Sequence, residues 1–176
     1  MILLITGASH TGKTVLAQKL MQKYGYPYLS IDLLKMGLIR SGQTALGPES
    51  PDAALTDYLW PIVREMIKTA IENDQKMIVE GCYIPFEWHK DFTEDYLRQI
   101  HYLCLVMASA YIHKNWESIC AHANDIECRQ AGSWLSPEKM EHENREYLQG
   151  CIEYGLNYVL ITDEYPKNLE ADAFSV

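Results

Sequence analysis

The stretch GASHTGKT, residues 7 to 14, constrains the fold of this chain more than any other feature. It follows an apolar run at residues 2–6 and leads into a helix-like pattern at residues 14–24, so it connects a buried strand to a helix. Successive N–H groups of a glycine-containing turn can curl around an anion, and the positive end of the next helix faces the same point. The stretch therefore predicts a strand–turn–helix unit that binds phosphate.

Each fixed position of the pattern G-x-x-x-x-G-K-[ST] has a chemical role in binding a nucleotide. Gly7 and Gly12 shape the turn, Lys13 brings a positive charge to the β- and γ-phosphates, and the Thr14 hydroxyl can ligate Mg²⁺. The variable positions His10 and Thr11 complete the predicted cofactor-binding set, with a solvent-facing loop position as the alternative for His10. The competing interpretation of the whole stretch is an ordinary glycine turn with a surface lysine.

The rest of the chain alternates between strand-like and helix-like segments. Further strands are predicted at residues 28–30, 76–80, 100–107 and 158–161, and helices at 33–39, 55–73, 91–98, 108–123 and 137–154. Asp32 and Asp91 are the expected caps of two of these helices. The alternation predicts one α/β domain, residues 1–176, with a parallel sheet whose ligands bind at the carboxyl edge of the strands.

Composition limits the partners and the compartment. Fifteen basic against 24 acidic residues give a formal charge of −9, which disfavours binding to a nucleic acid polymer but leaves room for a small anion. Five cysteines, an odd number without C-x-x-C spacing, favour a reducing compartment, so we expect a cytoplasmic protein. The N-terminal apolar run is too short for a signal peptide or a membrane span. We expect a monomer or homodimer.

The loop resembles the Walker A loop of P-loop NTPases. The wider layout, with the loop near residue 10 and an aspartate just after the second strand, is similar to small-molecule kinases of the adenylate kinase and shikimate or gluconate kinase type. This resemblance implies a three-layer P-loop NTPase fold, a five-stranded parallel sheet of order 2-3-1-4-5 with helices on both faces, and ATP with Mg²⁺. It also implies an acceptor-binding insertion at about residues 33–60 and a mobile lid at about 124–135.

Two carboxylates stand where such kinases act on the phosphoryl acceptor. Asp32, after the second strand, could orient an acceptor hydroxyl and take its proton, and the alternative is a cap of the following helix. Glu80 ends the third strand and could serve the Mg²⁺ hydration shell or the acceptor. Gly81, directly after it, would let a ligand or the phosphate loop approach.

A second resemblance concerns nucleoside monophosphate kinases. SIDLLK at residues 30–35 looks like the S/T-G-D-L-L-R of adenylate kinases, with Ile31 in place of the glycine and Lys35 in place of the arginine. Lysine keeps the charge but loses the bidentate fork. No arginine follows Glu80, where the D-G-F-P-R segment of that family has one. These departures make a nucleoside monophosphate the second choice of acceptor, while Lys35 stays in the predicted substrate site.

Few arginines are available to hold an anion. Arg40 lies on the acceptor side and is predicted to bind substrate, as is Arg64 unless it forms a surface ion pair with Glu65. Arg129 lies in the predicted lid and would stabilise the charge on the transferring phosphoryl group, and Arg145 could assist it. The aromatic segment YIPFEWH, residues 83–89, either lines the acceptor pocket or packs as an ordinary loop.

Together these features predict an ATP-dependent phosphotransferase that acts on a small metabolite at a hydroxyl group. Lys13, Asp32 and Arg129 would be its catalytic residues, and Thr14 and Glu80 would serve the metal. The alternatives are a nucleoside monophosphate kinase and a non-catalytic nucleotide-binding regulatory module. A signalling GTPase is disfavoured because the chain lacks N-K-x-D and T-K-x-D motifs.

Overall fold

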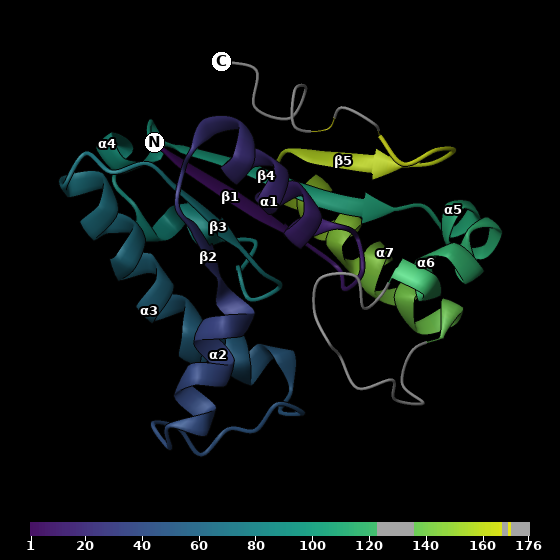
Figure 1. Cartoon of the computed structure of the whole chain (residues 1–176), viewed down its shortest axis with the longest axis horizontal. Helices are drawn as coiled ribbons and strands as arrows, with labels where there is room; N and C mark the ends of the chain where they lie inside the picture. The colour runs from purple at the N-terminus through teal and green to yellow at the C-terminus, as the bar shows by residue number, and fades with distance from the viewer. Residues whose placement is uncertain (123–135, 167–168, 170–176) are drawn as a thin grey trace.

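A five-stranded parallel sheet forms the centre of the molecule (Figure 1). The computed structural model describes residues 1–122, 136–166 and 169. The strands are β1 (Ile2–Gly7), β2 (Tyr28–Ser30), β3 (Met77–Glu80), β4 (Ile100–Met107) and β5 (Tyr158–Ile161), and their spatial order is β2-β3-β1-β4-β5. Both the parallel sheet and its predicted order are confirmed.

Helices connect the strands and cover the two faces of the sheet. They are α1 (Lys13–Tyr24), α2 (Ile31–Arg40), α3 (Asp52–Glu72), the 3-10 helix η1 (Trp88–Asp91), α4 (Glu94–Leu97), α5 (Ser109–Lys114), α6 (Trp116–His122) and α7 (Pro137–Glu153). Ser136 caps α7 by accepting a hydrogen bond from the N–H of Lys139 at 3.2 Å, and Pro137 occupies its first turn, as the sequence predicts. No helix in the described ranges is long and apolar enough to cross a lipid bilayer.

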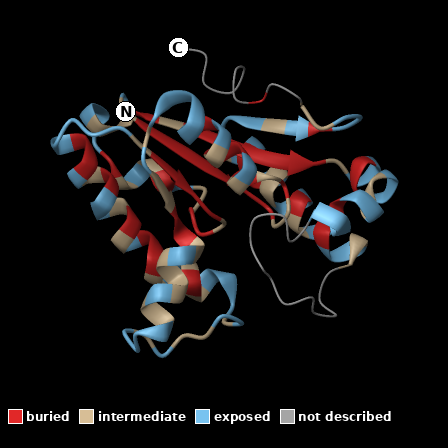
Figure 2. Ribbon diagram, in the orientation of Figure 1, coloured by how far each residue is buried: buried red, intermediate tan, exposed pale blue. Residues whose placement is uncertain are grey.

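Alternate residues of β1 supply the two main parts of the core. Ile2 and Leu4 pack with α3 on one face, while Leu3 and Ile5 pack with α1 on the other. A third cluster lies among the ends of β4 and β5 and the helices α5, α6 and α7. Figure 2 shows the buried strands β1 and β4 between helices whose outer surfaces are exposed, which is the three-layer arrangement predicted. The edge strand β5 is largely exposed.

Three local predictions are wrong. The helix expected over 108–123 is two helices, because Asn115 ends α5 and its side-chain amide donates to the carbonyl of Tyr111 at 3.0 Å; position 123 lies outside the described residues. Asp91 does not cap α4, because its carboxylate accepts hydrogen bonds from Trp60 and Arg64 instead. The cap of α2 is Ser30, so Asp32 lies inside the first turn.

The register of the sheet gathers the carboxyl ends of three strands at one edge. Ser30 of β2 pairs with Glu80 of β3, Glu80 pairs with Ile5 of β1, and Gly7 pairs with Leu105 of β4. The ends of β1 and β3 are tied further by a hydrogen bond from the Thr6 hydroxyl to the carbonyl of Gly81 at 2.9 Å. The glycine loop, the start of α2 and Glu80 therefore meet at this edge.

Candidate active site

The turn between β1 and α1 needs glycine at both of its fixed glycine positions. Gly7 has φ +137°, and a Cβ there would lie 2.2 Å from the carbonyl oxygen of Leu105. Gly12 has φ +86°, and its Cβ would lie 2.2 Å from the hydroxyl oxygen of Tyr165. His10 also takes a left-handed backbone, with φ +63°. The turn is thus tightly wound and enclosed by β4 on one side and Tyr165 on another.

Lys13 is buried at the start of α1, with 5% of its surface exposed. Its Nζ donates to the carbonyl oxygen of Ala8 at 2.8 Å, and the Thr11 hydroxyl donates to the same oxygen at 2.9 Å. Because the helix begins at Lys13, its first N–H groups lack intrahelical partners and point toward the turn. A buried cation and a helix N-terminus at one turn create a site that favours an anion.

Glu80 joins three elements at the edge of the sheet. Its side chain is 99% buried, and one carboxylate oxygen, Oε1, accepts a hydrogen bond from the Tyr28 hydroxyl at 2.9 Å. The Thr14 hydroxyl lies 3.4 Å from the same oxygen. The two residues predicted to serve the metal are therefore adjacent, with hydroxyl and carboxylate oxygens of the kind that Mg²⁺ prefers.

Asp32 and Lys35 form an ion pair in the first turns of α2. Lys35 Nζ donates to Asp32 Oδ1 at 2.7 Å and to the Tyr83 hydroxyl at 2.8 Å, and lies 4.9 Å from the centre of the Tyr83 ring. Burial of Lys35 works to lower its pKa, but the Asp32 carboxylate and Tyr83 together outweigh it and raise that pKa. Burial raises the pKa of Tyr83 to about 12, so its hydroxyl stays protonated at neutral pH.

Gly81 allows a close approach, and the group that approaches it is Ile31 at the start of α2. The φ of Gly81 is +159°, and a Cβ there would lie 2.8 Å from the Cβ of Ile31. The N–H of Gly81 donates to the carbonyl of Ile5 at 3.1 Å. Gly81 therefore brings α2 against the end of β3, and in doing so helps to set the position of Asp32.

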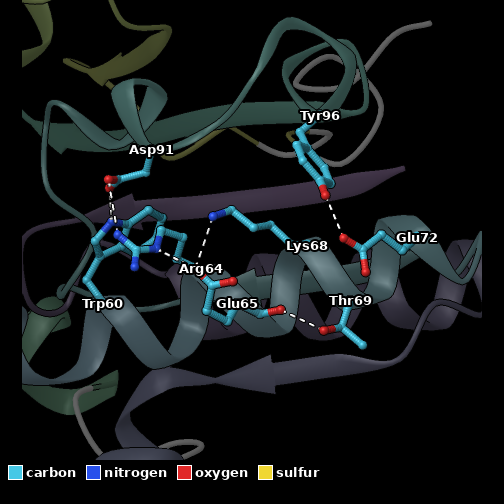
Figure 3. A network of polar contacts seen from close by, with 8 residues as sticks. All are labelled: Trp60, Arg64, Glu65, Lys68, Thr69, Glu72, Asp91 and Tyr96. Atoms are coloured by element: carbon cyan, nitrogen blue, oxygen red, sulfur yellow. Dashed lines mark hydrogen bonds and ion pairs between the residues drawn. The ribbon is translucent and has the colours of Figure 1, made fainter.

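Three of the four arginines singled out in the sequence lie among the described residues. Arg40 is exposed at the end of α2, eight residues or about 12 Å along the helix axis from Asp32. Arg64 forms ion pairs with Glu65 at 2.8 Å and Asp91 at 3.2 Å, in a network between α3 and residues 88–96 (Figure 3), so the surface-pair alternative applies to it. Arg145 pairs with Glu141 at 2.8 Å. The predicted lid, with Arg129, lies outside the described residues.

A carboxylate on α7 also faces the phosphate loop. Burial raises the pKa of Glu143, as does Asp52 nearby, while Lys139, Lys13 and a hydrogen bond from the N–H of Ser9 act in the opposite direction. Glu143 thus lies within the electrostatic reach of Lys13. No sequence pattern indicates Glu143, because nothing in its neighbourhood along α7 distinguishes it from the other glutamates there.

Three tyrosines in and around the site were also missed as site residues. Tyr28 contacts Glu80 across 52 residues of sequence, and the Tyr83 hydroxyl contacts Lys35 across 48. The Tyr165 hydroxyl donates to the carbonyl oxygen of Thr11 at 3.1 Å, across 154 residues. Only Tyr83 had a signal, as the first residue of the aromatic segment 83–89. Tyr83 is buried in the first core cluster, which is compatible with both alternatives for this segment.

Two solved structures are similar to the chain over nearly all of its length. A gluconokinase from Sinorhizobium meliloti 1021 has a TM-score of 0.51 at 12% sequence identity, covering 97% of this chain and 85% of its own. A shikimate kinase from Bacteroides thetaiotaomicron has a TM-score of 0.52 at 14% identity, covering 97% and 90%. No protein-family model and no curated protein matches the sequence. With the strand order and the glycine turn, these likenesses show that the chain has the fold of the P-loop small-molecule kinases.

Proposed function

We propose that this protein transfers the γ-phosphoryl group of ATP to a hydroxyl group of a small metabolite. The observation that carries the proposal is the meeting of three groups at one edge of the sheet: the glycine turn with Lys13, the Glu80 carboxylate, and the Asp32 carboxylate. A phosphate donor, a metal and an acceptor are the three components of a kinase reaction, and each of these groups suits one of them.

The residues of the turn fit the phosphates of ATP. Glycine at positions 7 and 12 permits the tight turn whose backbone N–H groups would bind phosphate oxygens, and Lys13 Nζ would exchange the carbonyl of Ala8 for one of these oxygens. Thr14 and Glu80 would hold Mg²⁺, which would neutralise charge on the phosphates during transfer. The described residues contain no group of three or more His, Cys, Asp and Glu suited to a metal, so nucleotide oxygens and water would complete its coordination.

Asp32 is the proposed general base. As the oxygen of the acceptor hydroxyl bonds to the γ-phosphorus and the bond to ADP breaks, the Asp32 carboxylate takes the hydroxyl proton. Lys35, 2.7 Å from Asp32 Oδ1, fixes the carboxylate and leaves Oδ2 available to the acceptor. The lid with Arg129, and a substrate-binding role for Arg40, remain predictions of the same proposal.

A nucleoside monophosphate acceptor fits the site less well. Two of the three N–H groups of Lys35 are already directed to Asp32 and Tyr83, and its charge is balanced by Asp32. An acceptor phosphate carries about two negative charges at neutral pH and is best held by a bidentate, uncompensated arginine. A non-catalytic nucleotide-binding module is also less favoured, because such a module needs no carboxylate at the position of Asp32.

The test is ADP release from Mg²⁺-ATP with a panel of acceptors: sugars, hydroxy acids, amino alcohols, AMP and CMP. We expect one class of alcohol to raise turnover many-fold, and Asp32→Asn to remove this stimulation while ATP affinity is kept. Asp95→Asn is the matched control, because Asp95 also lies in a first helical turn and pairs with a cation three residues later, Arg98 at 3.3 Å. Stimulation by AMP or CMP alone would favour the monophosphate kinase, and no stimulation by any acceptor would favour the binding module.

A further inference from the structure

Tyr165 reaches the phosphate loop from the opposite end of the chain. It follows β5 and packs against the third core cluster, which contains Met107, Tyr111 and Ile161. Its hydroxyl donates to the carbonyl oxygen of Thr11 at 3.1 Å. Burial, with a smaller contribution from Tyr111, raises the pKa of Tyr165 to about 12, so this hydroxyl is a hydrogen-bond donor at all physiological pH values.

The same hydroxyl and ring also occupy the space beside Gly12. A Cβ on Gly12 would lie 2.2 Å from the hydroxyl oxygen and 3.0 Å from Cζ of Tyr165. The ring therefore fills the volume that a side chain at position 12 would take. Tyr165 thus restrains the Thr11–Gly12 peptide in two ways, by a hydrogen bond to its carbonyl and by steric contact next to its nitrogen.

The orientation of this peptide decides where the N–H of Gly12 points. The chain contains no cis peptide bond among its described residues, and in a planar trans peptide the C=O and the N–H point in opposite directions. Because the carbonyl of Thr11 points toward Tyr165, the N–H of Gly12 points away from it. Among the described residues this N–H meets no acceptor, so it is available to a ligand held by the turn.

We propose that Tyr165 is a positioning residue for phosphate binding, which fixes the Thr11–Gly12 peptide so that the Gly12 N–H faces the phosphates. The inference rests on the proposed function only in requiring that the turn binds the nucleotide. If Tyr165 instead contacted the base or the sugar of ATP, its replacement would leave the affinity for a polyphosphate without base and sugar unchanged.

The experiment compares Tyr165→Phe with the wild-type protein and with Tyr111→Phe. Tyr111 is a matched control because it is buried in the same cluster but does not contact the turn through a hydrogen bond among the described residues. Calorimetry would measure the affinity for Mg²⁺-ATP and for Mg²⁺-tripolyphosphate, which has no base or sugar. A thermal melt of each variant would show that the protein remains folded.

For Tyr165→Phe we expect both affinities to fall by the same factor, about three- to tenfold, as the loss of one hydrogen bond implies. For Tyr111→Phe we expect both to stay within about twofold of wild type. Unchanged affinities in a folded Tyr165→Phe would overturn the inference, and so would a loss confined to ATP. If the wild-type protein bound neither ligand, the nucleotide-binding function itself would be refuted, which is a separate result.

Discussion

Replacing Glu80 tests whether its buried carboxylate serves the metal or only the fold. Glu80→Gln keeps the shape of the side chain and an oxygen that can accept from Tyr28 and Thr14, but removes the negative charge. A buried charge is costly to desolvate, and its neutral isostere avoids that cost. We therefore expect Glu80→Gln to fold normally and to lose the contribution of Mg²⁺ to ATP binding.

The size of each effect follows from the contacts of Glu80. Glu80→Ala removes the carboxylate that accepts from the Tyr28 hydroxyl at 2.9 Å, and with it a longer contact at 3.4 Å to Thr14. Since a hydrogen bond to a charged group contributes about 1.5–3 kcal/mol, the alanine variant should lose about 2–4 kcal/mol of unfolding free energy. Glu80→Gln should change it by less than about 1 kcal/mol, yet lower the Mg²⁺ enhancement of ATP affinity by about 10–100-fold.

The assay is a pair of calorimetric titrations with ATP, one with Mg²⁺ and one with a chelator, together with urea unfolding of each variant. Glu72→Gln is the matched control, because Glu72 also accepts a tyrosine hydroxyl hydrogen bond, from Tyr96 at 2.5 Å, but is exposed at the end of α3 (Figure 3). If Glu80→Gln kept the full Mg²⁺ enhancement, the carboxylate would have no role at the metal. If it lost as much stability as Glu80→Ala, the charge itself would be structural.

Two further predictions concern stability. Because the pKa values of Tyr83 and Tyr165 are raised to about 12 in the folded state, both contribute stability that is present below pH 10 and lost as pH rises toward 12. In urea unfolding, the free energy of unfolding should fall by about 1 kcal/mol per tyrosine between pH 10 and 11. This fall should be smaller in Tyr83→Phe. An equal fall in that variant would contradict the argument that burial raises the pKa. Gly7→Ala should lower the free energy of unfolding by more than about 3 kcal/mol, because its Cβ would clash with the backbone of Leu105. Gly25 has φ +69° and open space around it, so Gly25→Ala should lower the free energy of unfolding by only about 1–2 kcal/mol. Equal losses in the two glycine variants would show that contact with β4 is unimportant.

Most of the fold could be predicted because its signals are local. Each strand is an apolar run with a clear stop, and predicted and observed bounds differ by one residue at most, as for 76–80 against Met77–Glu80. Two of the three helical errors arise where a side chain forms a hydrogen bond other than the expected one. Asn115 turns back onto the carbonyl of Tyr111 and ends α5, although no glycine or proline marks the position. Asp91 does not cap α4 because its carboxylate accepts hydrogen bonds from Trp60 and Arg64, which lie 31 and 27 residues earlier in the chain.

The candidate site likewise contains residues that a local pattern identifies and residues that only contacts between distant parts of the chain bring in. Gly7, Gly12, Lys13 and Thr14 could be named because the anion-binding turn is complete within eight residues, and Asp32 and Glu80 because the ends of neighbouring parallel strands meet. Neither rule identifies Tyr28 or Tyr165. Tyr28 contacts Glu80 across the paired strands β2 and β3, and Tyr165, which follows β5, contacts the turn across 154 residues of sequence. A tyrosine is an ordinary core residue in a sequence, since its ring satisfies the apolar pattern. It becomes part of the site only through the direction of its hydroxyl, which is fixed when the whole domain has folded.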